Sequence, residues 1–147
     1  MNGQPRRCRQ SGFSLLEVLI TLLIIAIGLM GFAAMMLNSM KNNRLTMQRS
    51  LATAYAYDII DCMRVNRAAA VGGSYTMTAF GQKPGSGTVA ADDVSAWQDQ
   101  LGNLLPNGMG KISFPAGGNV VKVEVQWKET SNAGDDATHT WETETTL

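Results

Sequence analysis

The chain has 147 residues, a formal net charge of zero and only two cysteines, Cys8 and Cys62. This length fits one modest domain plus an additional helical segment, and two cysteines predict no disulfide framework. Arg6, Arg7 and Arg9 lie in the first twelve residues without an acid, so the remainder holds nine basic and twelve acidic side chains. Non-specific nucleic-acid binding needs clustered Lys and Arg, so this mildly acidic remainder argues against a nucleic-acid partner.

An apolar segment follows the basic leader. Residues 18–37 are apolar apart from Thr21 and two glycines. In a helix they cover about 30 Å, which is one hydrocarbon thickness. The segment is longer than the core of a secretory signal peptide, and no small-residue cleavage site follows it. The arginines before it predict a cytoplasmic N-terminus and an exported C-terminal part, which is the arrangement of a single-span signal anchor.

Glu17 is a carboxylate at the front edge of this segment. One interpretation is that it reaches toward water, because a charge near the interface costs less than one at mid-bilayer. The other is a functional role. A cut between Gly12 and Phe13 would create an amino group one helical turn, about 6 Å, from Glu17. In a low dielectric such a carboxylate binds an ammonium group strongly, so it can recruit the N-terminus of a neighbouring copy.

The stretch GFSLLEVLI after a short basic leader resembles the class III signal of type IV pilins and their relatives. The resemblance implies that a prepilin peptidase removes residues 1–12 by cutting after Gly12. It implies that the same enzyme methylates the new amino group of Phe13. It also implies that Glu17 docks the subunit onto its neighbours.

The helix is expected to continue well beyond the apolar segment. No proline occurs between Phe13 and Ala70, which predicts one helix of about 55 residues. Residues 13–37 are assigned to the membrane or a filament core, and residues 38–71 to an amphipathic continuation that ends at Gly72 and Gly73. The apolar arc of that continuation is predicted to hold Met40, Met47, Leu51, Ala54, Tyr55 and Cys62, widened by Leu45, Ala52, Ala56, Ile59 and Met63. Cys62 is interpreted as a small buried hydrophobe, and Asp58 as a buried polar group with a partner.

Residues 72–147 predict a small domain. A short helix is expected from a cap at Asp92 or Asp93, with apolar positions Val94, Trp97, Leu101 and Leu104 and a stop at residues 105–108. Strands are expected at residues 111–114, 120–129 and 138–147, joined by loops at 115–119 and 131–136. In the middle strand, the apolar residues Val121, Val123, Val125 and Trp127 alternate with polar ones. The predicted fold class is α+β, with a long N-terminal helix packed by its second half on an antiparallel sheet of three or four strands.

The sequence offers little for catalysis. A Cys62–His139 nucleophile pair is conceivable, but no orienting third group or oxyanion element can be identified. The acidic pairs at 92–93 and 135–136 lack the spaced ligands of a calcium loop. Phosphate-loop, zinc and dinucleotide motifs are absent from the sequence. We therefore expect a protein without cofactor or metal that is not an enzyme.

A narrower resemblance is to the PilV family of minor pilins, the pilus modification proteins. It is carried by a helix end that contains Asp58, Met63, Arg64, Asn66 and Arg67, and then by Trp97, Leu105, Pro106, Gly108 and the strand 123–127. No cysteine follows Cys62 and no proline interrupts the span, which departs from major pilins.

This narrower resemblance implies a protein of the bacterial inner membrane with a periplasmic C-terminal domain. The protein then becomes a low-copy subunit of a priming or tip complex on the pilus or cell surface. Its partners would be other minor pilins, the major pilin, the inner-membrane assembly platform and membrane lipid. A role in adhesion or motility is part of the same expectation. Two alternatives stay open: a pseudopilin of a type II secretion system, and an uncleaved single-span anchor that carries a small enzyme or binding domain.

Overall fold

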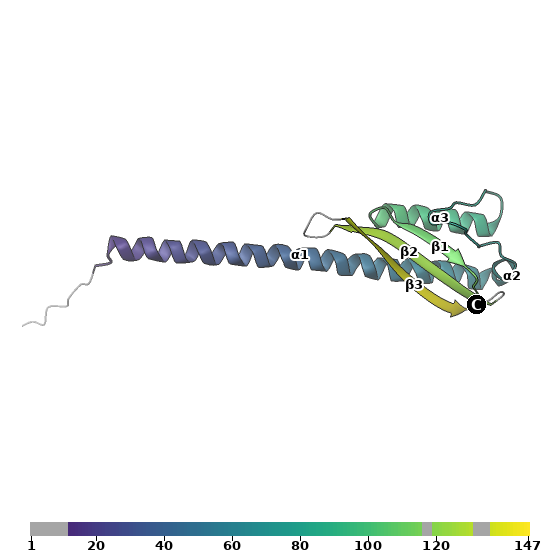
Figure 1. Ribbon diagram of the computed structural model, residues 1–147, viewed down its shortest axis with the longest axis horizontal. Helices are drawn as coiled ribbons and strands as arrows, with labels where there is room; N and C mark the ends of the chain where they lie inside the picture. The colour runs from purple at the N-terminus through teal and green to yellow at the C-terminus, as the bar shows by residue number, and fades with distance from the viewer. Residues whose placement is uncertain (1–11, 116–118, 131–135) are drawn as a thin grey trace, which may run out of the picture. The chain divides into compact units, whose positions relative to one another are not determined.

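The computed structural model describes residues 12–115, 119–130 and 136–147 (Figure 1). The chain divides into two compact units, Met1–Asn42 and Asn43–Leu147, and each is described by itself. The basic leader with Cys8 lies outside the described residues, as do most of the two predicted loops, 116–118 and 131–135. The elements follow the order α1, α2, α3, β1, β2, β3.

Helix α1, Leu15–Val65, begins at a serine cap. The Leu16 N–H donates to Ser14 Oγ at 3.3 Å, and the Glu17 and Val18 N–H groups donate to the Ser14 carbonyl at 3.0 and 3.3 Å. These bonds satisfy amide groups that have no partner within the first turn of a helix. The start of the helix is therefore fixed by the residue that directly precedes the apolar run.

The prediction of one uninterrupted helix to residue 71 is wrong at Asn66, where α1 ends and the short helix α2, Arg67–Val71, begins. Asn66 leaves the helical region with φ −105° and ψ 45°, and its Nδ2 donates to the Tyr75 hydroxyl at 3.2 Å. An asparagine side chain that bonds outside the helix competes with helical backbone geometry. The predicted stop is confirmed, because Gly72 caps α2 and Gly73 adopts a φ of 85°.

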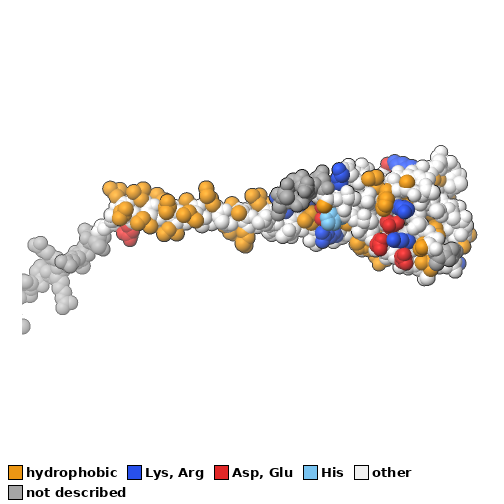
Figure 2. Space-filling model, in the orientation of Figure 1, with side chains coloured by type: hydrophobic (Ala, Val, Ile, Leu, Met, Phe, Trp, Pro, Cys, Tyr) orange, Lys and Arg blue, Asp and Glu red, His pale blue; other side chains and the backbone are white. Residues whose placement is uncertain are grey.

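The face of the first unit drawn in Figure 2 carries apolar side chains along the length of its helix. Phe13 and every large hydrophobic residue from Leu15 to Met40 are exposed. Among the described residues, α1 is the one helix long and apolar enough to cross a membrane, judged by length and composition. An apolar surface of this kind needs an apolar environment.

The second unit buries only part of the apolar arc predicted for α1. Ala52, Ala56, Ile59 and Met63 are buried as predicted, whereas Ala54 is exposed. Met47 is 63% exposed, Asp58 is exposed, and Leu51, Tyr55 and Cys62 are only half-buried. The expectation of a buried Asp58 is therefore wrong. The buried residues of α1 are Gln48, Ala52, Ala56, Ile59, Ile60 and Met63. The two alanines, which lack bulk beyond Cβ, lie at i and i+4 on the buried stripe, which therefore follows the widened edge of the predicted arc and not its centre.

The sheet confirms the predicted α+β class. Strands β1, Met109–Ser113, β2, Val120–Thr130, and β3, Asp136–Thr146, form one antiparallel sheet in the order β1-β2-β3. The middle strand matches its prediction, whereas β1 and β3 each begin two residues earlier than expected. Val121, Val123, Val125 and Trp127 are buried, as the alternation predicts.

Helix α3, Val89–Leu104, is capped by Thr88 and not by Asp92 or Asp93 as predicted. Thr88 has the extended backbone of a cap residue, and its Oγ1 accepts from the Ala91 N–H at 3.2 Å. Leu105 ends the helix and Asn107 turns the chain with a φ of 52°, which confirms the predicted stop. Leu104 is 44% exposed, contrary to its assignment to the apolar face.

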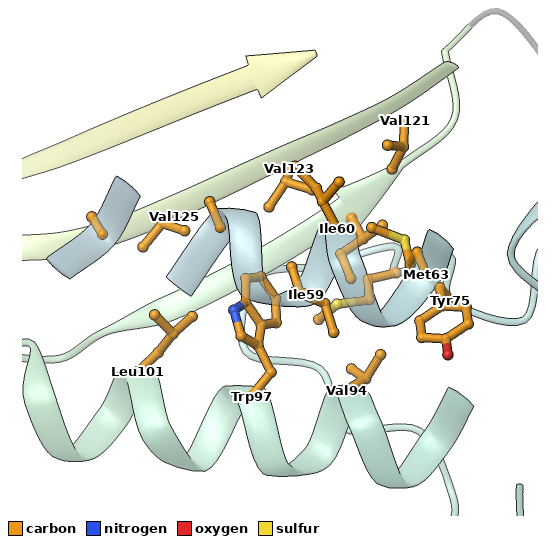
Figure 3. Close-up of a cluster of buried hydrophobic side chains, with 14 of the residues drawn as sticks. Ile59, Ile60, Met63, Tyr75, Val94, Trp97, Leu101, Val121, Val123 and Val125 are labelled. Carbon is orange, nitrogen blue, oxygen red and sulfur yellow. The ribbon is translucent and has the colours of Figure 1, made fainter. Parts of the chain in front are cut away.

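The core of the second unit lies between α1, α3 and the sheet (Figure 3). Helix α1 supplies Ile59, Ile60 and Met63, α3 supplies Val94, Trp97 and Leu101, and β2 supplies Val121, Val123 and Val125. The Trp97 indole N–H donates to the Tyr55 carbonyl at 2.8 Å and thereby joins the two helices. A Cβ added at Gly110 would lie 2.1 Å from the Trp97 ring, so glycine is required where β1 passes over the indole.

Candidate functional site

The predicted processing site lies in front of α1. Residues 12–14 precede the helix, Gly12 and Phe13 are both exposed, and a Cβ added at Gly12 would meet no atom within 4 Å. The peptide bond between Gly12 and Phe13 is therefore outside regular structure and open to an enzyme. Helical backbone would have to unwind before a peptidase could bind it in an extended form.

Glu17 lies exposed in the first turn of α1. A carboxylate in this turn interacts favourably with the partial positive charge of the helix N-terminus. Thr21, one turn further on, donates its hydroxyl proton to the Glu17 carbonyl at 2.6 Å and so needs no external partner. The structure thus brings Phe13 and Glu17 into the same exposed helix start, with the acid one turn away.

Ser14 is a residue of this region that the sequence reasoning missed. Ser14 and Glu17 have the spacing of a capping box, in which a serine precedes an acid by three residues. That spacing was a readable signal for the helix start. It also gives Glu17 a local contribution to helix initiation, separate from any role between subunits.

A second polar cluster surrounds Glu129 in the globular unit. Glu129 is only 5% exposed. Arg49 donates from Nε to Oε1 and from Nη2 to Oε2, both at 3.3 Å, and the Trp127 indole N–H donates to Oε1 at 3.2 Å. His139 Nε2 lies 3.2 Å from Oε2. The carboxylate therefore links α1 to β2 and β3.

An open groove of about 630 Å³ adjoins the Glu129 cluster. It lies between α1 and the β2–β3 hairpin, and its walls are formed by Thr46, Arg49, Ser50, Thr53, Trp127, His139, Thr140 and Trp141. Its lining combines hydroxyl groups, two cationic or titratable side chains and two indoles. A groove with this lining can accept an extended chain or another mixed polar and apolar group.

A third cluster holds the end of α1. The Tyr75 hydroxyl donates to Asp93 Oδ2 at 2.6 Å and accepts from Asn66 Nδ2. Burial, together with the bond to the Asp93 carboxylate, raises the pKa of Tyr75 to about 12. Asp93, predicted as a helix cap, instead ties α3 to the segment that follows α2.

The conceivable nucleophile pair is not assembled. His139 bonds Glu129 beside Arg49, whereas Cys62 lies about 20 Å further along α1 than Arg49. Burial, with the negative charges of Asp93, Asp58 and Asp61, raises the pKa of the Cys62 thiol, which keeps it in its unreactive protonated form. Within the described residues, no three His, Cys, Asp or Glu side chains come close enough to hold a metal ion.

The landmarks of the narrower resemblance have structural roles in this chain. Met63 is fully buried, and the exposed Arg64 bonds Asp61 at 2.8 Å. Arg67 Nε donates to the Leu147 carbonyl at 3.0 Å, which attaches the start of α2 to the residue that follows β3. The Arg67 bond and the buried Met63 stabilise the packing of the helices on the sheet, whereas the Arg64–Asp61 pair lies within α1.

Comparison with known proteins identifies the N-terminal segment. Residues 7–33 match the family described as the prokaryotic N-terminal methylation motif. No curated protein and no solved structure matches the chain. The match supports a type IV pilin-like protein with a class III signal, and it suggests a structural subunit in place of an enzyme. Together with the apolar N-terminal helix, it suggests a membrane-anchored pilin.

Proposed function

We propose that this protein is a minor type IV pilin of the PilV type, a low-copy subunit that takes part in pilus biogenesis within a priming or tip complex. The observation that carries the proposal is the N-terminal arrangement. A methylation motif spans residues 7–33, an exposed Gly12–Phe13 bond precedes an apolar helix, and a single acid, Glu17, lies in its first turn.

The proposed mechanism begins with processing. Prepilin peptidase cuts after Gly12 and methylates the amino group of Phe13. The exported globular unit stays outside the inner membrane, while residues 13–37 remain in lipid until the assembly platform moves the subunit into the filament. The exposed non-helical bond in front of α1 supports this step, because it needs no unwinding before cleavage.

Docking follows from the energetics of an isolated charge. Glu17 is costly in hydrocarbon, and it is stabilised when the methylated ammonium group of a neighbouring subunit reaches it. The pairing also fixes how far one helix is displaced along the other. The partners in this step are the major pilin and other minor pilins, whose N-termini carry the same chemistry.

Mass spectrometry of the protein purified from its own membranes tests the processing step. We expect a mature chain that begins with N-methylated Phe13, and a Gly12→Leu variant that keeps its leader, because the larger side chain blocks the cut. A wild-type protein that functions with residues 1–12 attached would overturn the proposal and favour the uncleaved membrane anchor.

Filament shearing tests the docking step. We expect Glu17→Ala to be processed normally and to disappear from sheared pili, because the ammonium group of the neighbour loses its partner. Thr21→Ala is the matched control, since it also removes a polar group one turn away. Equal recovery of the Glu17 variant and wild type in the filament fraction would refute the docking role.

A type II secretion pseudopilin is the second candidate, since the methylation motif alone does not distinguish the two assemblies. Deletion of the gene separates them. Loss of surface pili with normal exoprotein release supports the pilin, and the reverse result supports the pseudopilin.

A further inference from the structure

The two edges of the sheet differ in how their backbone groups are satisfied. At the β1 edge, the Gln98 side chain donates to the Gly110 carbonyl at 2.8 Å and accepts from the Gly110 N–H at 3.0 Å. The Met77 N–H also donates to the Ile112 carbonyl, and the Gly81 N–H to the Gly110 carbonyl. The β1 edge is therefore covered.

The β3 edge is open. Strand β3 pairs with β2 over its full length, Asp136–Thr146, and within the described part of the chain no other strand pairs with it. The Leu147 N–H donates to the Asn119 carbonyl. In an antiparallel ladder, pairs that exchange hydrogen bonds alternate with pairs that do not, so the backbone groups of every second residue point away from β2. The outward-pointing set is Thr138, Thr140, Glu142, Glu144 and Thr146.

An exposed strand of this length is unusual, because unpaired edge groups bind other strands. Natural sheets protect such edges with proline, a bulge, charged side chains or a covering segment. Strand β3 contains no proline, and its register with β2 runs from Asp136 to Thr146 without a bulge. Its threonines favour extended structure. The edge therefore has the geometry needed to bind a further strand.

Charge indicates what kind of strand fits. On the solvent face of the sheet, Lys122 bonds Glu142 at 2.8 Å and lies 3.6 Å from Glu124. Glu144 stands opposite Lys122 in the register, yet the Lys122 ammonium group is directed to Glu142. The edge strand thus carries two carboxylates, Glu142 and Glu144, and the Lys122 ammonium group bonds Glu142. A basic side chain on an added strand would complete the alternation of charge across the sheet.

A second copy of this chain does not fit this edge. If two β3 strands paired, Glu142 and Glu144 of each copy would put four carboxylates on two adjacent strands, and neither strand would bring a lysine or arginine. Like charges on adjacent strands destabilise their pairing. The charge of the edge therefore favours a segment of a different protein.

The groove provides a second contact. His139 and Trp141, whose side chains point to the α1 side of the sheet, line the groove together with Thr46, Ser50 and Thr53 of α1. Side chains on the same side of an added strand would lie next to this lining. Backbone bonds to the edge would provide affinity, and the groove would select the side chains that enter it.

We propose that the open edge of β3 binds an extended, basic segment of another protein, which adds to the sheet as a further strand beside the Trp141 groove. This interaction goes beyond the filament role, because it needs only the globular unit and not the Phe13–Glu17 chemistry.

Photo-crosslinking in the full chain, in the membranes of the producing cell, tests the proposal. A benzophenone amino acid replaces Thr138 on the open edge, and the matched control carries it at Ser113 on the covered edge. We expect an adduct with a different protein from position 138 only, joined through an extended segment with lysine or arginine. Adducts of equal yield at both positions, an adduct of two copies of this chain, or no protein adduct would overturn the proposal.

Two variants of the position-138 probe sharpen the result. Thr140→Pro removes one outward N–H and leaves the bonds to β2, so the adduct yield should fall about tenfold, whereas Thr140→Val should keep it. Reversal of both charges, with Glu142→Lys and Glu144→Lys, should lower the adduct yield by a similar factor. This second variant keeps every backbone N–H group of the edge, so it tests the charge preference without the effect of a proline on the strand. A yield unchanged by both variants would refute strand addition.

N-terminal processing is followed in the same samples. Normal cleavage before Phe13 with loss of the adduct shows a defect confined to the sheet edge. Failure of the proposed pilin role would instead appear at the N-terminus while the adduct persists.

Discussion

Glu129 is a carboxylate at a position where strand alternation places an apolar side chain. The buried face of β2 runs through Val121, Val123, Val125 and Trp127, and the same parity brings Glu129 inward. The structure satisfies both carboxylate oxygens with Arg49, His139 and Trp127. A buried charge that keeps all its partners is tolerated, but removing one partner leaves the others unpaired.

We expect Glu129→Ala to lower the free energy of unfolding by about 2 kcal/mol, because the Trp127 N–H and the Arg49 guanidinium lose their acceptor. Urea unfolding of the purified chain in detergent, followed by tryptophan fluorescence, measures the change. Glu144→Ala on the exposed edge is the control and should change the value by less than about 0.5 kcal/mol. Equal urea midpoints for the two variants would contradict a structural role for Glu129.

Tyr75 makes the globular unit sensitive to alkali. Its pKa of about 12 in the folded state lies above its ordinary value of 10.0, so the fold favours the neutral phenol. This contribution to stability is complete below pH 10 and is lost as the pH rises through 12. Tyr75→Phe should cost about 1 kcal/mol at neutral pH and should weaken the fall in stability above pH 10.

Urea unfolding at a series of alkaline pH values, with phenolate absorbance recorded in parallel, checks the Tyr75 prediction. Tyr57→Phe is the control, because Tyr57 is 49% exposed and its hydroxyl is not part of the Asp93 cluster. If the two variants show the same pH dependence, the Tyr75–Asp93 bond does not stabilise the fold.

At the scale of elements, helix α3 begins at Thr88 although the sequence offers three possible N-cap residues, Thr88, Asp92 and Asp93. Thr88 carries the side-chain bond to the Ala91 N–H, while Asp92 lies within the first turn. We expect Thr88→Ala to cost about 1 kcal/mol of unfolding free energy and Asp92→Ala at most about 0.5 kcal/mol. Urea midpoints of the two variants compare the effects. A larger cost at Asp92 would restore the cap that the sequence suggested.

The periodic elements could be predicted because their patterns are local. The alternation in β2 identified its buried face, and the glycine pair identified the end of α2. The buried residues Ala52, Ala56, Ile59 and Met63 of α1 were on the predicted arc, but its centre was placed on larger side chains, because the packing of the alanines depends on α3 and the sheet. Thr88 was equally readable as a cap, but Asp92 and Asp93 competed with it in the sequence.

In the candidate site, too, the residues that are close in sequence could be predicted and the contacts between distant residues could not. Gly12, Phe13 and Glu17 form a linear motif, so their arrangement follows from the helix alone, and their processing and docking roles stay predictions. The Glu129 cluster joins residues 80 positions apart in the chain. No local pattern contains such a contact, although the parity of β2 was a sign that Glu129 faces inward.

At the scale of the whole molecule, the two units separate the anchor from the folded core. Every buried side chain of the described residues lies at Gln48 or beyond, within the unit Asn43–Leu147. We expect residues 43–147 to be soluble and to unfold with the urea midpoint of the full chain in detergent. Loss of a cooperative transition in the shorter chain would show that residues 12–42 contribute to its stability.

The Gln98 side chain has a consequence for how large any sheet-mediated complex becomes. Its amide bonds both backbone groups of Gly110 as a peptide group of a neighbouring strand would, so the β1 edge is covered and only the β3 edge can bind another strand. A protomer with one open sheet edge can add one strand, and it has no second open edge at which a further protomer could bind. Strand pairing at this domain therefore ends after one addition, which protects the globular unit from runaway fibrous aggregation.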